Sequence, residues 1–95
     1  MIVLTSHGIL GMIIEAIHNH TGLIREISPT ETFGTDLDVH PSDILEAINP
    51  QLEAWCCMLS TADAKDVMGV DGITVQDLVA FVVSAIERKG IKVAQ

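Results

Sequence analysis

Ser42 is the residue whose type and place in the sequence are best suited to chemistry. It is the only hydroxyl between Thr35 and Ser60, and it stands where an acidic stretch gives way to a run of helical spacing. A hydroxyl in the first turn of a helix faces solvent, where a modifying enzyme reaches it. A phosphodiester attached there would meet free backbone N–H groups and the positive end of the helix dipole. The sequence leaves open a plainer interpretation, in which Ser42 is only an N-cap.

Two other short patterns have simpler structural explanations. His18-Asn19-His20 has the letters of a nuclease motif, but that motif needs a strand-rich metal fold and a basic DNA-binding face. Two surface histidines at a helix end, where positive charge favours the dipole, explain the pattern better. Cys56 and Cys57 have no second pair and no histidines at zinc-finger spacing, so we expect small residues packed on a helix.

The acidic stretch before the serine does not have the pattern of a calcium loop. Asp36, Asp38 and His40 alternate as the first ligands of such a loop do, but the loop needs Gly at its sixth position and Glu at its twelfth. Pro41 and Ala47 stand there instead. The chain also lacks the G-x-S-x-G and H-E-x-x-H motifs of hydrolases. We therefore expect no enzymatic activity, no catalytic residue and no metal site.

Charge and composition narrow the class of partner. The chain has 5 Lys and Arg residues against 13 Asp and Glu, a net charge of −8. Such a surface repels nucleic acid and anionic membranes and favours basic protein surfaces. The apolar runs at 9–14 and 78–83 are far shorter than the roughly 18–20 residues that span a bilayer. The first residues, MIVLTSHG, lack the positive region of a signal peptide, and neighbouring cysteines make no disulfide framework. We expect a cytoplasmic protein.

The sequence predicts a helix and a long connection before Ser42. Residues 6–20 have apolar side chains at helical spacing, with Ser6 as the expected N-cap and Gly22 as the left-handed stop. Residues 22–41 contain proline, glycine and several polar residues. Connections of this length tend to be functional, and the apolar residues within this one should pin it to the core, so we expect an ordered loop.

Residues 42–59 form a second helical segment, which starts at the serine. It carries three acidic side chains that could bind a basic protein surface. Asn49-Pro50 interrupts it, which predicts either a kink or two helices that meet there. At 100° per residue, Asp43, Glu46 and Glu53 fall within about 80° of one another if the helix is continuous. These three carboxylates form the candidate docking face.

Two further helical segments complete the chain. We expect a short helix over residues 62–68. Thr74 and Asp77 form a capping-box pattern at the start of a last helix over 75–89. That last helix is apolar on much of its circumference, including Phe81, so we expect exposed apolar surface on it. Either the first four residues of the chain cover that surface, or a partner or a second copy does, which allows self-association.

The sequence thus predicts one all-α domain over residues 1–95, with its core at about 6–90. We expect a small antiparallel bundle of three long helices and one short helix, because strand patterns are nearly absent and the later connections are short. The aromatic content is 3%, so the core must be aliphatic. Its expected members are Ile9, Ile13, Ile14, Ile17, Leu23, Ile27, Phe33, Leu37, Ile44, Leu45, Ile48, Leu52, Val67, Ile73, Leu78, Val79, Val82 and Ile86.

The order of these segments resembles the acyl carrier protein family over about residues 7–88. Phe33-Gly34-Thr35-Asp36-Leu37 is similar to the start of the family's F-x-x-D-L-x-x-D-S-L stretch. Ile73-Thr74-Val75-Gln76-Asp77-Leu78 is similar to the family's lead into its last helix. A first helix followed by Gly22-Leu23-Ile24 also fits the pattern. The resemblance implies the family's bundle and its long ordered loop.

The chain diverges from the family around the attachment serine. Counted from Leu37, the family's serine falls at Pro41, and Ser42 comes one place later. In this plain count, His40 replaces the family's preceding aspartate. If Ser42 is the equivalent residue, Pro41 replaces that aspartate and Asp43 replaces the following leucine. The stretch between this site and the last helix is also about five residues longer than in the family. The resemblance therefore bears on the fold more than on the attachment chemistry.

The resemblance implies a carrier function that itself catalyses nothing. A phosphopantetheinyl transferase would attach 4'-phosphopantetheine from coenzyme A to Ser42, and the thiol of that arm would hold an acyl group as a thioester. Fatty-acid- or polyketide-type enzymes would receive it, docking their basic patches on the acidic second helix, here Asp43, Glu46 and Glu53. The divergence keeps a second function open, a carrier-like domain without an arm that acts in protein–protein interaction.

Overall fold

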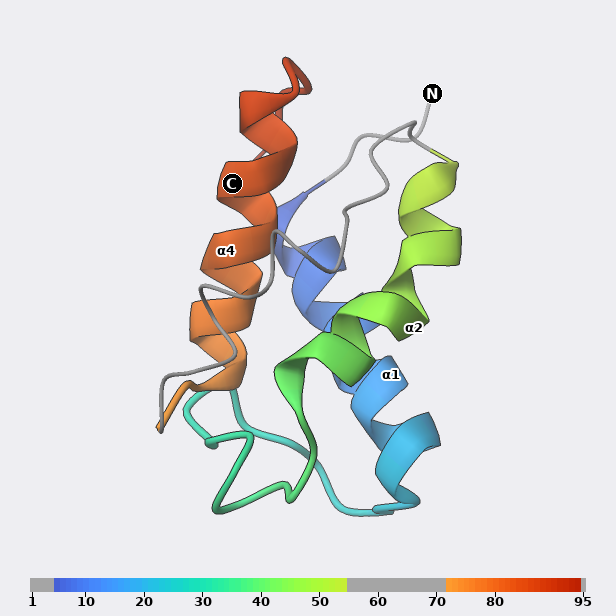
Figure 1. Ribbon diagram of the computed structural model, residues 1–95, viewed down its shortest axis with the longest axis vertical. Coiled ribbons are helices and arrows are strands. Elements are labelled where there is room, and N and C mark those ends of the chain that lie inside the picture. Colours follow the sequence, from blue (N-terminus) through green and yellow to red (C-terminus); the bar gives the residue numbers. More distant parts are fainter. Residues whose placement is uncertain (1–4, 55–71, 95) are drawn as a thin grey trace.

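The computed structural model describes residues 5–54 and 72–94, and the regular secondary structure of this part is entirely helical. Extended pairing within it is limited to two isolated β-bridges. The expected all-α class is therefore confirmed. The helices, drawn in Figure 1, are α1 (Ser6–Thr21), α2 (Pro41–Glu53) and α4 (Val75–Arg88). The expected short helix over 62–68, and with it Val67, Cys56 and Cys57, falls outside the described residues.

Thr5, and not Ser6, is the N-cap of α1, so the expected cap was wrong by one residue. Thr5 has extended backbone angles (φ −123°, ψ 155°), and its side-chain oxygen accepts the N–H of Gly8 at 2.9 Å. At the other end Gly22 has φ 75°, in the left-handed region that glycine adopts without strain. Its N–H donates to the carbonyl of His18 at 2.9 Å. The expected stop of the first helix is confirmed.

α2 runs through Pro50 as a single helix and ends at Glu53, so the alternative of two separate helices is wrong. Its ribbon changes direction along its length (Figure 1). A bend is expected of a helix that lacks the N–H of Pro50. The helix also begins earlier than expected, at Pro41, because His40 is its N-cap. Proline suits the first helical position, where its missing N–H would have no helical partner.

α4 has the capping box that the sequence predicts. The side chain of Thr74 accepts the N–H of Asp77 at 3.1 Å, and the carboxylate of Asp77 accepts the N–H of Thr74 at 3.0 Å. Arg88 lies in the last turn, where a cation favours the helix dipole. Gly90 follows with φ 88°. The expected helix over 75–89 is right to within one residue.

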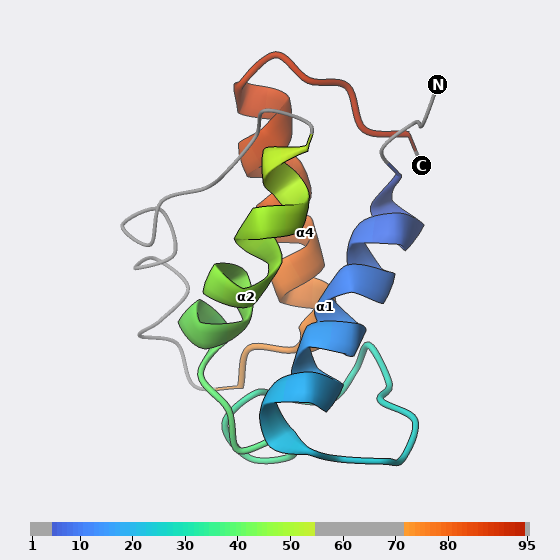
Figure 2. The ribbon, with the colours of Figure 1, turned by 90° about the vertical axis from the view of Figure 1, so that its right-hand side faces the viewer.

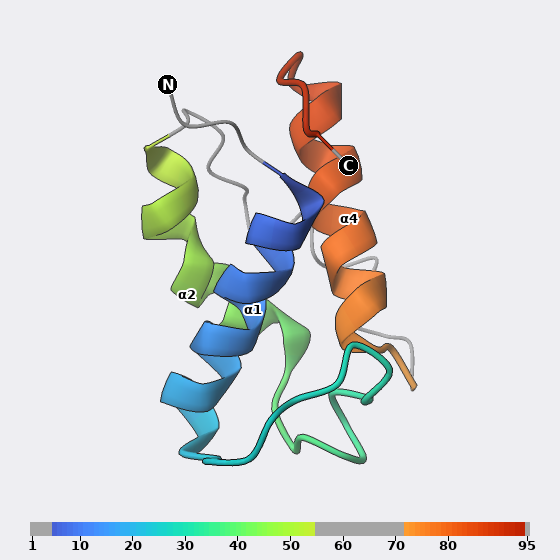
Figure 3. The same ribbon diagram turned by 180° about the vertical axis from the view of Figure 1, so that it is seen from behind.

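α1 lies at the centre of the bundle, with α2 on one side and α4 on the other (Figure 3). Aliphatic side chains of all three helices form the core, together with the ring of Phe33 from the segment between α1 and α2. The expected core residues within the described ranges are buried, except Ile14 and Leu23, which are half-buried. At 100° per residue, Ile14 lies about 100° from the middle of the stripe that runs from Ile9 to Ile17. Six further residues are buried that the expected core does not include: Ala16, Val39, Pro41, Val75, Ala85 and Val93.

The C-terminal residues return to the start of α1. Figure 2 shows the chain running from the end of α4 toward the beginning of α1. Val93 is buried, and Ala94 forms a parallel bridge with Thr5. The N–H of Ser6 donates to the carbonyl of Ala94 at 2.9 Å. Both ends of the described chain are thus tied to each other.

Less apolar surface is exposed on α4 than expected. Phe81 and Val83 are half-buried and pack against the core. Among the described residues, Ile24 is the one large hydrophobic side chain that is fully exposed, and it lies outside α4. Self-association through α4 stays a prediction. No helix within 5–54 or 72–94 has the length and apolar character needed to cross a bilayer.

Candidate functional site

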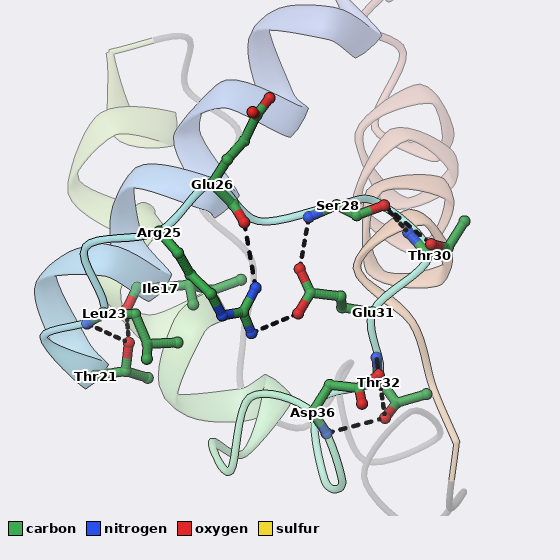
Figure 4. Close-up of polar contacts among 10 residues, drawn as sticks. All are labelled: Ile17, Thr21, Leu23, Arg25, Glu26, Ser28, Thr30, Glu31, Thr32 and Asp36. Atoms are coloured by element: carbon green, nitrogen blue, oxygen red, sulfur yellow. Dashed lines mark hydrogen bonds and ion pairs between the residues drawn. The ribbon is translucent and has the colours of Figure 1, made fainter.

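Side-chain hydrogen bonds hold the first half of the segment between α1 and α2 (Figure 4). The guanidinium of Arg25 pairs with the carboxylate of Glu31, with 2.5 Å between Nη2 and Oε1. The other carboxylate oxygen of Glu31 accepts the N–H of Ser28 at 2.6 Å. The hydrogen bond from Arg25, followed by that from Ser28, lowers the pKa of Glu31. The same bond raises the pKa of Arg25.

Backbone hydrogen bonds join this segment to the start of α4. The N–H of Phe33 donates to the carbonyl of Ile73 at 2.9 Å, and the N–H of Val75 donates to the carbonyl of Glu31 at 3.0 Å. The side chains of Phe33 and Leu37 are 1% and 3% exposed, so they anchor the segment in the core. The segment is therefore positioned by both its backbone and its buried apolar residues. Ile24, which was also expected to pin it to the core, is fully exposed.

A turn held by Asp36 brings the chain back toward α2. The carboxylate of Asp36 accepts the N–H of Thr32 at 2.9 Å, and the N–H of Asp36 donates to the carbonyl of Thr32 at 3.2 Å (Figure 4). Asp38 has φ 51°, a left-handed conformation that aspartate tolerates better than most residues. The N–H of Val39 then donates to the carbonyl of Phe33 at 3.0 Å. These bonds fix where α2 starts.

His40 caps α2 and also contacts the hydroxyl of Ser42. The residue before a proline favours extended backbone angles, and His40, which precedes Pro41, has φ −84° and ψ 135°. Its Nδ1 accepts the N–H of Ser42 at 3.3 Å and lies 2.8 Å from Ser42 Oγ. In the tautomer protonated on Nε2, Nδ1 accepts the backbone N–H, and the Ser42 hydroxyl is the donor in the second bond. The N-cap interpretation of Ser42 is therefore wrong.

The free backbone N–H groups expected around Ser42 are already used in the first turn. Pro41 has no N–H, and that of Ser42 donates to His40 Nδ1. The N–H of Asp43 donates to the carbonyl of His40 at 3.0 Å. A phosphodiester on Ser42 would have the helix dipole beside it, but it would obtain the Ser42 N–H only by displacing the imidazole.

The three carboxylates of the candidate docking face, Asp43, Glu46 and Glu53, are all exposed and lie on one continuous helix. The carboxylate of Asp43 is 3.9 Å from Nε2 of His20 in the last turn of α1. The continuous helix on which the 80° estimate depends is present. The docking role itself stays a prediction.

The two histidines expected at the end of α1 lie in its last turn. His20 is exposed, whereas His18 is half-buried, and its Nε2 is enclosed without a hydrogen-bond partner in the described structure. The description of both as surface histidines was therefore wrong for His18. Across the described ranges, no three His, Cys, Asp or Glu side chains gather as a metal site would require.

An open pocket of about 230 Å³ lies between α1 and α2. The lining residues are Glu15, Ala16, Asn19, His20, Ala47 and Gln51.

His40 is the site residue that sequence reasoning did not identify. The sequence patterns include His40 only in the rejected calcium loop and as a counterpart of the family's aspartate, and histidine is not among the preferred N-caps. The signal was the order His40-Pro41-Ser42. The proline fixes the histidine in an extended conformation, and Nδ1 then stands as far along the side chain as the capping oxygen of asparagine.

No family model, no curated protein and no solved structure matches this chain. The resemblance to acyl carrier proteins therefore depends on the sequence patterns alone.

Proposed function

We propose that this chain is a carrier of the acyl carrier protein type, with 4'-phosphopantetheine on Ser42 and an acyl group on the thiol of that arm. The observation that carries the proposal is the environment of the Ser42 hydroxyl. It stands half-exposed in the first turn of α2, and the cap of the helix is His40. Attachment to Ser42 Oγ therefore takes no side-chain cap from the helix, because the oxygen of Ser42 does not cap it.

The order of the described elements supports the same proposal. Phe33 and Leu37 belong to the family-like stretch that precedes Ser42. Both are buried and anchor the segment that leads to α2. Thr74 and Asp77 belong to the family-like stretch before the last helix, and they form a reciprocal cap. In the proposed architecture, residues 62–68 supply a short third helix, and the segment between α1 and α2 is the long loop of a four-helix bundle.

Partner enzymes, including a phosphopantetheinyl transferase, would approach through the acidic side of α2. Asp43 and Glu46 are exposed next to Ser42, and Glu53 is exposed further along the helix. With a net charge of −8 the whole chain attracts basic surfaces, and charge complementarity mainly raises the association rate. The fatty-acid- or polyketide-type enzymes that would exchange acyl groups are proposed to bind the same face.

Loading by coenzyme A tests the proposal directly. The protein is incubated with coenzyme A and a broad-specificity phosphopantetheinyl transferase, and its intact mass is measured. We expect one phosphopantetheinyl group on the wild type and none on Ser42→Ala. Ser28→Ala is the matched control, because Ser28 is an exposed serine in the segment that leads to the site. This variant should load like the wild type.

A second function, a carrier-like domain without an arm, is favoured by one observation. The first-turn N–H groups of Ser42 and Asp43 are already occupied by His40. If several transferases leave a folded wild type unmodified, the carrier proposal is wrong and binding through the acidic side of α2 is the function that remains. Pull-down by basic protein surfaces that Asp43→Lys abolishes would then identify it.

A further inference from the structure

We infer that His40 is the general base for Ser42, taking the hydroxyl proton as Ser42 Oγ attacks a phosphorus centre. The inference rests on the proposed function, because it concerns the step that would load Ser42. The reactivity of the pair can nevertheless be measured without coenzyme A. The observation behind it is the 2.8 Å contact between Ser42 Oγ and His40 Nδ1, within the range of a nucleophile and its base.

The imidazole of His40 is held in place by the backbone. Pro41 is buried and restricts His40 to its extended conformation. The carbonyl of His40 accepts the N–H of Asp43, and its Nδ1 accepts the N–H of Ser42. The first bond holds the backbone of His40, and the second orients its exposed ring toward Ser42. The unprotonated nitrogen is therefore already directed at the hydroxyl before any partner binds.

The loading step can be written with every bond balanced. Ser42 Oγ attacks the phosphorus of coenzyme A that bears pantetheine, and a new Oγ–P bond forms. The P–O bond to the second phosphate of the pyrophosphate breaks, and adenosine 3',5'-bisphosphate leaves with that bonding pair. The hydroxyl proton goes to His40 Nδ1, which gives an imidazolium.

The same proton transfer provides donors for the product. An imidazolium protonated at Nδ1 no longer accepts the Ser42 N–H, so that backbone group is released to the phosphate oxygens. The Nδ1–H of His40 becomes a charged donor beside the new phosphodiester. A first turn in which Pro41, Ser42 and Asp43 offer no free N–H thus gains two donors as the phosphate arrives.

A fluorophosphonate probe tests the pair without a transferase. In that reaction Ser42 Oγ displaces fluoride from phosphorus, and the hydroxyl proton must leave in the same way. His40→Asn is the informative variant, because the amide oxygen of asparagine can accept the Ser42 N–H as a cap but is not a base. His7→Asn, at an exposed histidine of α1, is the matched control.

We expect the wild type and His7→Asn to be labelled at Ser42 at least about tenfold faster than His40→Asn, since a positioned base contributes more than this in enzymes. Ser42→Ala should remain unlabelled. Equal labelling of the wild type and a folded His40→Asn would overturn the inference. Nitrogen NMR gives a second test, because the neutral ring of His40 should carry its proton on Nε2. A neutral ring protonated on Nδ1 would also overturn it.

Loading with coenzyme A separates this inference from the function it rests on. If His40→Asn slows probe labelling while the wild type is never loaded from coenzyme A, the carrier proposal is wrong and the inference that His40 is a base is supported. If the wild type is loaded and His40→Asn has the same kcat and the same labelling rate, the carrier stands and the base fails. A lower kcat with an unchanged KM in His40→Asn supports both, because the base acts on chemistry and not on docking.

Discussion

Replacing Phe33 with alanine tests whether the segment between α1 and α2 belongs to the core. The ring is 1% exposed and belongs to the largest fully buried side chains of the described structure. Truncation of a buried phenylalanine costs about 3–5 kcal/mol. A chain of 95 residues is expected to have a total stability of roughly 5–14 kcal/mol. Phe33→Ala should therefore remove a large share of the stability of the whole domain.

Ile24→Ala is the matched comparison, because Ile24 lies in the same segment and is 100% exposed. Its truncation should change stability by no more than about 0.5 kcal/mol. Thermal unfolding followed by circular dichroism distinguishes the two. We expect the Tm to fall by at least about 12 °C in Phe33→Ala and to stay nearly constant in Ile24→Ala. Equal Tm values for the two variants would refute the packing of this segment against the helices.

Arg25→Gln should raise the pKa of Glu31, because the hydrogen bond from Arg25 is the main cause of its lowering; a carboxyl NMR titration measures it. Because the pKa is lowered in the folded state, the ion pair stabilises the fold at pH values above the ordinary glutamate pKa. This contribution is lost as the pH falls through the lowered value. The difference in stability between the wild type and the variant should therefore shrink in acid. Thr74→Ala should cost about 1 kcal/mol in urea unfolding, and an unchanged midpoint would contradict the reciprocal cap. Asp43→Lys combined with Glu46→Lys should slow association with a transferase far more in low salt than in high salt, and equal slowing in both would count against docking through this face.

The sequence correctly predicts a helix end where one residue or one short motif determines it. Gly22 stops α1 because glycine adopts a positive φ without strain, and Thr74 with Asp77 fixes the start of α4. At α1 the signal was ambiguous, because Thr5 and Ser6 are adjacent residues of the same capping class. Only the backbone conformation decides which of the two side chains reaches the Gly8 N–H.

Features that depend on packing could not be predicted in the same way. Pro50 alone predicts a kink or a break, and buried side chains on both sides of it decide between them. Ile48 and Leu52 are both fully buried, which keeps the helix continuous across the proline. The capping role of His40, by contrast, has a local signal in the order His40-Pro41-Ser42, which is unusual because histidine is not a preferred N-cap.

The position of the attached group tests the carrier function of Ser42 most directly. The wild type is treated with coenzyme A and a transferase, digested, and its peptides are fragmented in a mass spectrometer. We expect one phosphopantetheinyl group, located on Ser42 and absent from every peptide of Ser42→Ala. A group on another hydroxyl, or a folded wild type that stays unmodified, would contradict Ser42 as the attachment site.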